Sequence, residues 1–371
     1  MQRSGPTTLR AGGRPEGRGS HTVRTKVLGA RDMAVLLRDV GRDRLMDLMI
    51  ERLRQRMRDH AEDTVEVRTR DGFRYEKPDL GLVEWMPTHE IGGPVVVKMV
   101  GYHPTNPLQR ALPSVIATSS MWDTETGHLV AIADATLLTA LRTGAASGVA
   151  TDVLARTGPV TVGLVGLGAQ AVTHVHAVSR VRQVEHVLAL DVLPEVASSF
   201  PARVAFTGVD VELVDPARMA SLVGEVDVLC TTTSVDIGAG PVVADTPHRR
   251  WLHINAVGAD FPGKLELPRS LVARSLVIPD ILKQCLVEGE CQQAPPDRIG
   301  PELSAVVQRE SEFVARRHDL TVFDSTGWAV EDDVALRLAV ELAAERGLGT
   351  DVELEHLPAD PYDPYSDHSD R

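Results

Sequence analysis

The chain has 371 residues, a length that suggests two domains because a single domain usually has about 100–200 residues. It carries 39 Lys and Arg against 52 Asp and Glu, so its net charge is −13, which argues against a nucleic-acid or anionic-membrane partner. No apolar run approaches the ~20 residues of a membrane-spanning helix. Three cysteines, Cys230, Cys285 and Cys291, form neither a disulfide framework nor a CxxC pair. We therefore expect a reduced, cytoplasmic protein.

The first third of the chain changes character twice. Residues 1–22 are rich in Gly, Arg, Ser, Thr and Pro, and we expect a disordered tail there. Residues 31–60 carry apolar side chains at helical spacing, which predicts an amphipathic helical stretch. Residues 82–134 contain four apolar runs separated by Gly, Pro and Asn, which predicts strands. An Ala- and Leu-rich stretch, 135–156, then predicts a long helix.

From Val160 onward, short apolar strands alternate with helices as far as the run LTVFDS at 320–325. This alternation indicates a parallel sheet covered on both faces. A last helix is expected over 328–346, followed by an acidic, Pro-punctuated tail at 359–371. The predicted fold is α/β, with a Rossmann-type doubly wound parallel sheet, residues 145–327, inserted in a second α+β domain built from residues 23–144 and 328–358.

A dinucleotide fingerprint opens the parallel sheet. The strand VTVGLV leads into Gly166-Leu-Gly168-Ala-Gln-Ala171, a G-x-G-x-x-A turn at the start of a helix. Gly166 permits the tight turn, Gly168 lets the backbone approach a pyrophosphate, and the helix N-terminus favours the phosphates. Asp191 ends the next strand, where a carboxylate binds a ribose 2′-hydroxyl and favours NAD over NADP. A glycine turn without a ligand is the alternative interpretation.

Arg142 is the one charged residue in the apolar stretch LTALRTGAAS. It is either a surface arginine whose stem lies along apolar neighbours or a clamp for a carboxylate or phosphate, a role that suits the guanidinium group. The residues alone leave both interpretations open.

Several segments, in order, make the chain resemble the ornithine cyclodeaminase/mu-crystallin family. They are ALRTGAAS, GLGAQA, INAVGADFPGKLELP (254–268) and FDSTG (323–327), and the resemblance covers residues 24–356. Further segments resemble the lysine cyclodeaminase branch, whose members make pipecolate for secondary metabolites. These are EWMP, KMVGYHPTNP, EGECQQ, RIGPEL and the DPY motif near the C-terminus.

The resemblance implies a reaction without net redox change, in which NAD stays bound and is used catalytically. Hydride leaves the substrate Cα to give an imine, the distal amine attacks the imine carbon, ammonia leaves, and the hydride returns to the ring imine. For this chain it implies conversion of L-lysine to L-pipecolate. Three alternatives remain open: ornithine cyclodeamination to L-proline, a ketimine reductase or amino-acid dehydrogenase, and a non-catalytic crystallin-like nucleotide-binding protein.

The resemblance also implies site residues. Asp260, which follows a sheet strand, corresponds to the catalytic acid/base, and a turn or capping Asp is the alternative. Glu84 corresponds to the acid that faces the substrate amino groups, and a surface strand acid is the alternative. Both are expected to act on the substrate.

Three cations correspond to positions that hold the substrate carboxylate: Arg70, Lys98 and Arg142. Lys98 stands alone in the apolar run PVVVKMV, so if it is buried it needs an anion; a charge on an edge strand is the alternative. Arg68 and Arg74 make the register of Arg70 open to question.

Cofactor contacts are implied at many of the strand ends and helix starts. They are Ser114, Thr143, Gly166, Gly168, Ala169, Gln170, Asp191, Thr231, Ser234, Val257, Lys264 and Ser325. No metal is expected, because His174 and His176 lie two residues apart on a predicted helix and face different sides. Members of the family form dimers through the first domain, so the resemblance implies that this chain is a homodimer. It also implies that the first domain, residues 23–144 and 328–358, binds the substrate and forms the dimer interface.

Overall fold

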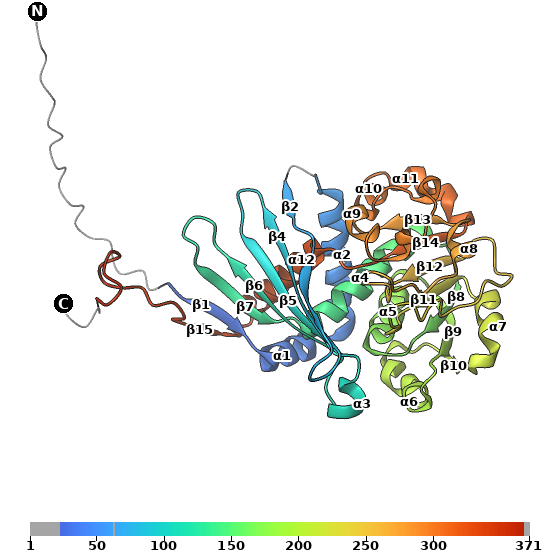
Figure 1. Cartoon of the computed structure of the whole chain (residues 1–371), viewed down its shortest axis with the longest axis horizontal. Coiled ribbons are helices and arrows are strands. Elements are labelled where there is room, and N and C mark those ends of the chain that lie inside the picture. Colours follow the sequence, from blue (N-terminus) through green and yellow to red (C-terminus); the bar gives the residue numbers. More distant parts are fainter. Residues whose placement is uncertain (1–22, 62–63, 367–371) are drawn as a thin grey trace, which may run out of the picture.

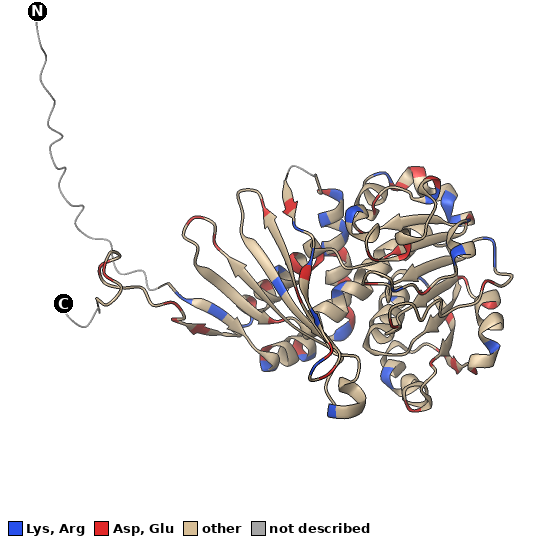
Figure 2. Cartoon of the chain, in the orientation of Figure 1, with Lys and Arg blue, Asp and Glu red and all other residues tan. Residues whose placement is uncertain are grey.

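The computed structural model describes residues 23–61 and 64–366 and consists of two lobes, each built on one sheet (Figure 1). The predicted tail at 1–22 and the last five residues of the predicted tail at 359–371 lie outside the described residues. Acidic and basic residues alternate along the helices and strands of both lobes (Figure 2). None of the described helices is both long and apolar enough to cross a membrane.

The first lobe contains a mixed eight-stranded sheet. Its order is β15-β1-β7-β6-β5-β4-β2, with β3 also paired to β4. The β1–β7 pair is parallel and the other neighbours are antiparallel. The strands are β1 (Thr25–Leu28), β2 (Val65–Val67), β3 (Asp71–Tyr75), β4 (Gly81–Glu90), β5 (Val95–Tyr102), β6 (Val115–Trp122), β7 (Leu129–Asp134) and β15 (Thr350–Val352).

Helices cover one face of this sheet and come from both ends of the chain. The expected helical stretch at 31–60 is two helices, because Gly41 adopts φ +84° between them. A short helix, α3 (Asn106–Arg110), lies in the β5–β6 connection. The covering helices are α1 (Ala30–Val40), α2 (Arg42–Arg58), α4 (Thr136–Leu154) and α12 (Ala329–Glu345).

The alternation of a β-strand decides which side chains face these helices. In β5, Val96 and Lys98 are each 1% exposed, whereas Met99 on the opposite face is 40% exposed. Ile116 and Trp122 of β6 lie exposed on that same outer face. A lysine therefore points into the core, and the outer face of the sheet is largely apolar.

The second lobe is a seven-stranded, wholly parallel sheet in the order β10-β9-β8-β11-β12-β14-β13. The strand order reverses between β8 and β11, which is where such sheets bind ligands. This confirms the α/β fold class with a Rossmann-type sheet. The strands are β8 (Val160–Val165), β9 (Val184–Leu190), β10 (Val211–Leu213), β11 (Val228–Thr231), β12 (His253–Ala256), β13 (Leu276–Pro279) and β14 (Thr321–Asp324).

The helices of the second lobe include α5, which begins directly at the predicted dinucleotide turn. Several others are short. They are α5 (Ala169–Val181), α6 (Pro194–Val204), α7 (Met219–Glu225), α8 (Arg269–Val272), α9 (Leu282–Cys285), α10 (Leu303–Gln308) and α11 (Glu310–Phe313).

Helix α4 lies between the lobes and is buried along nearly its whole length. It packs against α2 and α12 on one side and against α5 on the other. A helix that is apolar all round is expected in such an interior position. The predicted domain boundary at 144/145 falls inside α4, and the domain limits stay a prediction.

Close packing of α4 on α5 depends on Gly144. A Cβ atom at this position would lie 2.7 Å from the carbonyl oxygen of Thr173 on α5. We expect Gly144→Ala to lower the free energy of unfolding, because overpacking costs about 1–3 kcal/mol and alanine in a helix recovers only ~1 kcal/mol. Urea unfolding of both proteins measures the difference.

Gly29→Ala is the matched control, since its Cβ would meet only Asp32 Oδ2, at 3.9 Å, and its φ is −84°. Because Gly29 is the N-cap of α1, where alanine is less favourable than glycine, we expect this control to lose no more than about 1 kcal/mol. A Gly144→Ala protein as stable as the wild type would contradict the close approach of the two helices.

Candidate active site

The turn between β8 and α5 has the geometry that a dinucleotide needs. Gly166 adopts φ +85°, and a Cβ there would lie 2.9 Å from the carbonyl oxygen of Thr232, so only glycine fits. A Cβ on Gly168 would meet no described atom within 4 Å, which leaves the backbone accessible. Asp191 Oδ2 accepts a hydrogen bond from the Leu167 amide at 2.7 Å. The carboxylate at the end of β9 thus holds the turn.

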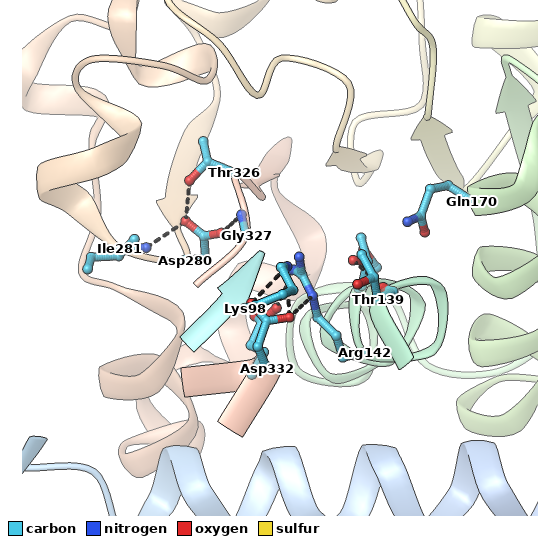
Figure 3. Close-up of polar contacts among 12 residues, drawn as sticks. Lys98, Thr139, Arg142, Gln170, Asp280, Ile281, Thr326, Gly327 and Asp332 are labelled. Carbon is cyan, nitrogen blue, oxygen red and sulfur yellow. Dashed lines mark hydrogen bonds and ion pairs between the residues drawn. The ribbon is translucent and has the colours of Figure 1, made fainter. Parts of the chain in front are cut away.

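Other polar groups at this edge of the sheet also fit a ligand. The hydroxyl of Ser325 is buried and has no hydrogen-bond partner among the described residues. Ser325 follows β14, and its amide donates to Ala256 O at the end of β12. Gln170, in the first turn of α5, faces the part of α4 that carries Thr139 and Arg142 (Figure 3). These residues can therefore hold a dinucleotide along the carboxyl ends of the strands.

The remaining predicted cofactor contacts differ in whether their polar groups already form hydrogen bonds within the protein. The hydroxyl of Thr231 donates to Glu266 Oε2 at 2.6 Å, and the hydroxyl of Thr143 donates to Thr139 O at 2.8 Å, so both side chains are already engaged. The Val257 amide donates to Thr231 O at 3.0 Å. Ser114 lies in the first lobe, before β6, where its carbonyl accepts from the amide of His103. Ala169 begins α5.

A cleft between the lobes contains a cavity of about 210 Å³. Its walls include Tyr102 of β5 on one side and Ser234 and Lys264 on the other. The Lys264 ammonium lies 4.6 Å from the centre of the Tyr102 ring and donates to Asp260 Oδ1 at 3.2 Å. Asp260 keeps 44% of its side chain exposed, so its carboxylate remains accessible from the cleft.

Two buried cations form the basic half of the site. Lys98 donates to Asp332 Oδ1 at 2.9 Å, and the Arg142 Nε donates to the same oxygen at 3.1 Å. Arg142 Nη1 also donates to Glu331 Oε2 at 2.8 Å. Figure 3 shows Lys98 and Arg142 converging on Asp332, which lies at the start of α12. One carboxylate therefore fixes the two cations side by side.

A third cation approaches the same point from the opposite side. A Cβ on Gly327, which adopts φ +96°, would lie 3.0 Å from Arg142 Nη2 and 3.3 Å from Arg70 Nη2. Arg70 is held there by the carbonyls of Thr326 and Gly327. Two guanidinium groups that face one small volume form a suitable site for a carboxylate.

Burial lowers the pH at which Lys98 loses its charge. Burial and the neighbouring Arg142 lower the pKa of the Lys98 ammonium to about 8, although Asp332 favours the charged form. Burial also opposes the charge of Arg142, but Asp332 and Glu331 outweigh it and raise the arginine pKa. Burial raises the pKa of Glu331 to about 8.

Carboxylates on the far side of Arg70 form the acidic half. Glu288 Oε1 lies 2.9 Å from Arg70 Nε, and Glu84 Oε2 lies 3.6 Å from Arg70 Nη1. Both acids are buried. Burial raises the pKa of Glu84, and the nearby Asp260 adds to the rise while Arg70 opposes it. Arg70 therefore joins the two groups of the site: it contacts both of these acids and lies beside Arg142 at Gly327. We call Lys98 and Arg142 the basic half, and Glu84 and Glu288 the acidic half.

Residues 31–347 match the ornithine cyclodeaminase/mu-crystallin family. The chain belongs to this family. An L-lysine cyclodeaminase of Streptomyces rapamycinicus is 42% identical over 345 residues, which cover 93% of this chain and 100% of that relative.

Solved structures of the family have the same fold. A lysine cyclodeaminase, described for its recognition of L-lysine, L-ornithine and L-2,4-diaminobutyric acid, has a TM-score of 0.89 at 47% identity, covering 92% of this chain and 99% of that one. An archaeal alanine dehydrogenase dimer with bound NAD has a TM-score of 0.78 at 28% identity, covering 90% of this chain and 100% of that one. Cyclodeaminases and a dehydrogenase thus share this architecture.

Sequence reasoning missed the acids that hold the predicted cations. Asp332 and Glu331 pair with Arg142, and Glu288 pairs with Arg70. Asp280, after β13, accepts from the Gly327 amide at 2.6 Å and so fixes the loop where the two arginines meet. The run Glu331-Asp332-Asp333 at the start of a helix was the available signal, because lone buried cations elsewhere in the chain require such partners.

The buried acids predict how stability changes with pH. Burial raises the pKa of Glu288, Glu290 and Glu331 to about 8 and that of Asp324 to about 7. These four acids outnumber the buried His174 and His253, whose pKa values are lowered to about 4 and about 3 and which give the opposite slope below about pH 6.5. The folded protein therefore holds more protons than the unfolded chain between about pH 5 and pH 8, so the free energy of unfolding should fall as pH rises through this window. Thermal unfolding at several pH values measures it.

Glu331→Gln removes one titrating group but retains a hydrogen-bond acceptor for Arg142. The Tm of this variant should therefore depend less steeply on pH than the Tm of the wild type. The window ends near pH 8 because the acids are deprotonated in both states above their folded pKa. Lys98, whose pKa is lowered to about 8, gives the opposite slope above that pH. A wild-type Tm that climbs steadily from about pH 5 to pH 8 would be incompatible with these buried acids.

Proposed function

We propose that this protein is an NAD-dependent L-lysine cyclodeaminase, which converts L-lysine to L-pipecolate and ammonia. The observation that carries the proposal is the division of the site into a basic half at Lys98 and Arg142 and an acidic half at Glu84 and Glu288. A diamino acid has one carboxylate and two ammonium groups, and this division matches it. The 42% identity to an L-lysine cyclodeaminase supports the same reaction.

The basic half binds and orients the substrate carboxylate. Arg142 Nη2 and Arg70 Nη2 both lie near the position that a Cβ on Gly327 would take, and Lys98 adds a buried positive charge. Anchoring the carboxylate here directs the α-amino group toward Glu84. Fixing both ends of a flexible substrate lowers the entropic cost of bringing the reacting atoms together.

Asp260 is the acid/base in this proposal. Its carboxylate accepts a proton from the distal ammonium, which leaves a free amine able to act as the nucleophile. Lys264 donates to Asp260 and so holds the carboxylate in position for this step. The exposed part of Asp260 gives the proton a route to solvent.

NAD is the proposed cofactor and supplies the hydride acceptor and donor of the reaction. Gly166, Gly168 and the N-terminus of α5 would hold its phosphates. Asp191 would accept from a ribose hydroxyl and repel the additional phosphate of NADP. Ser325 offers an unused buried hydroxyl beside the same strand ends.

L-Ornithine is the second candidate substrate. A solved lysine cyclodeaminase with 47% identity to this chain recognises L-ornithine as well as L-lysine. The two substrates differ by one methylene, which in a pocket is worth only about 1–3 kcal/mol. The same charged groups of this site would engage either one.

We also propose that the protein is a homodimer, that it is located in the cytoplasm, and that it contributes to secondary metabolism. The outer face of the first-lobe sheet supports dimerisation, because Met99, Ile116, Trp122 and Val130 leave an apolar surface exposed in the single chain. The alanine dehydrogenase of the same fold is a dimer.

Ammonia release tests the reaction. We expect purified protein with NAD to release ammonia faster from L-lysine than from L-ornithine, and to form L-pipecolate from L-lysine in equal amount. NADH absorbance should stay flat, because the hydride returns to the product. Ammonia assays and product chromatography on the two substrates measure this.

Faster release from L-ornithine would reverse the substrate assignment. NADH formation stoichiometric with turnover would instead show an oxidoreductase, and absence of turnover with both substrates would leave the non-catalytic nucleotide-binding alternative.

Replacing the proposed base gives a second test. Asp260→Asn should lower kcat by roughly 10²- to 10⁴-fold, the usual contribution of a general base, while the Kd for NAD changes little. Steady-state ammonia release and NAD titration measure the two effects.

Asp297→Asn is the matched control, because this carboxylate is 77% exposed and pairs only with the adjacent Arg298 among its described ion-pair partners. It should retain wild-type activity. An Asp260→Asn enzyme with normal kcat would exclude Asp260 as the base.

A further inference from the structure

Glu288 is a buried acid to which the mechanism above gives no separate role. Its side chain is 6% exposed, and Oε1 lies 2.9 Å from Arg70 Nε. That contact is not aligned as a hydrogen bond, and Oε1 has no hydrogen-bond partner among the described residues. A buried carboxylate oxygen without a donor is costly, so this atom is available to a ligand that brings one.

The charges around Glu288 are out of balance. Arg70 is in ion-pair contact with both Glu84 and Glu288, whereas Asp260 is paired with Lys264. Lys98 also favours the ionised form of Glu84. Burial raises the pKa of Glu288 to about 8, and Glu84, Asp260 and Asp280 add to the rise against the opposing effect of Arg70. Among the described residues, the two glutamates therefore have one ion-pair partner between them, Arg70.

The position of Glu288 suits the far end of a substrate. It follows α9 in the second lobe and crosses the cleft to Arg70, which comes from the first lobe. Arg142 lies close to the same arginine, since its Nη2 and Arg70 Nη2 are 3.0 and 3.3 Å from the position that a Cβ on Gly327 would take. Lys98 shares Asp332 with Arg142. A ligand whose carboxylate is held by these cations therefore lies near the carboxylates of Glu84 and Glu288, which both contact Arg70.

We propose that Glu288 is a specificity-determining residue: its carboxylate accepts hydrogen bonds from the distal ammonium of a diamino acid and so selects diamino acids over monoamino acids. The inference rests on the proposed function, since it assumes an amino-acid substrate anchored by its carboxylate. Glu84 then serves the α-amino group, Asp260 removes the proton for cyclisation, and Glu288 supplies the anion that only a second ammonium needs.

Binding of L-lysine and L-norleucine tests the proposal. The two amino acids share the same carbon chain and α-groups, but L-norleucine lacks the distal ammonium. Calorimetric titration uses protein saturated with NADH, which cannot accept a hydride, so no turnover disturbs the measurement. We expect Glu288→Gln to raise the Kd for L-lysine roughly 10- to 100-fold, the value of a hydrogen bond to a charged group. The Kd for L-norleucine should change less than about 3-fold on the same scale.

Glu290→Gln is the matched control. Glu290 is also buried and has a pKa raised to about 8, but its Oε1 accepts from the backbone amides of Glu266 and Leu267 at 2.7 and 3.1 Å. Its replacement should leave the ratio of the two Kd values unchanged. Glu288→Asp, which keeps the charge on a shorter side chain, should weaken L-lysine binding to an intermediate extent and serves as the test if Glu288→Gln does not fold.

Equal weakening of both ligands in Glu288→Gln would overturn the proposal, because Glu288 would then act only by positioning Arg70. An unchanged ratio, or a wild-type protein that does not prefer L-lysine to L-norleucine, would also overturn it. Failure of the proposed reaction has a different signature: the NADH complex would bind L-lysine selectively while the NAD complex released no ammonia.

Discussion

The whole site depends on the contact of two buried cations with one carboxylate. Lys98 and Arg142 both donate to Asp332, and each residue comes from a different part of the chain: β5, α4 and α12. Removing one partner from such a cluster leaves a buried charge uncompensated, which typically costs about 3–5 kcal/mol. The cluster therefore links the C-terminal helix to the sheet and holds two cations at the cleft.

This arrangement explains how the chain forms a site between lobes. Helix α4 passes directly from the sheet of the first lobe to the parallel sheet and carries Arg142 on the way. Helix α12 follows the last parallel strand and returns to the first lobe with Asp332. The two crossings lie side by side, so the residues near each crossing face the cleft. Gly327, at the second crossing, provides the space in which the arginines meet.

Sequence patterns predicted the parallel sheet and the nucleotide turn well, because both depend on local signals. Strand periodicity gave the order of elements, and the glycines near Gly166 report a backbone conformation directly. The first lobe was harder. Strands β2 and β3 were not predicted, since β2 has only three residues and β3 is exposed along most of its length.

The partners of the site residues could not be predicted from local patterns. Lys98 was expected to meet an anion, but Asp332 lies 234 positions away in the sequence, and no periodicity connects the two residues. Glu288 is similar: the motif around it marked a family branch without assigning its carboxylate, and only the fold brings it against Arg70. Long-range pairing of charges is a property of the fold, so a single sequence shows only that a partner is needed.

The charges of the site affect selection of the substrate class and selection of the substrate length differently. An acidic half in which Glu84 and Glu288 share one ion-pair partner, Arg70, distinguishes diamino from monoamino acids by charge, which is a large effect in a buried site. It does not distinguish L-lysine from L-ornithine, because both carry the same charges. That choice depends on the distance from the arginines at Gly327 to the carboxylates of Glu288 and Asp260, where one methylene changes the binding free energy by only about 1–3 kcal/mol. A site built in this way selects the class of substrate strictly and its length weakly, which agrees with a relative that recognises three diamino acids of different length.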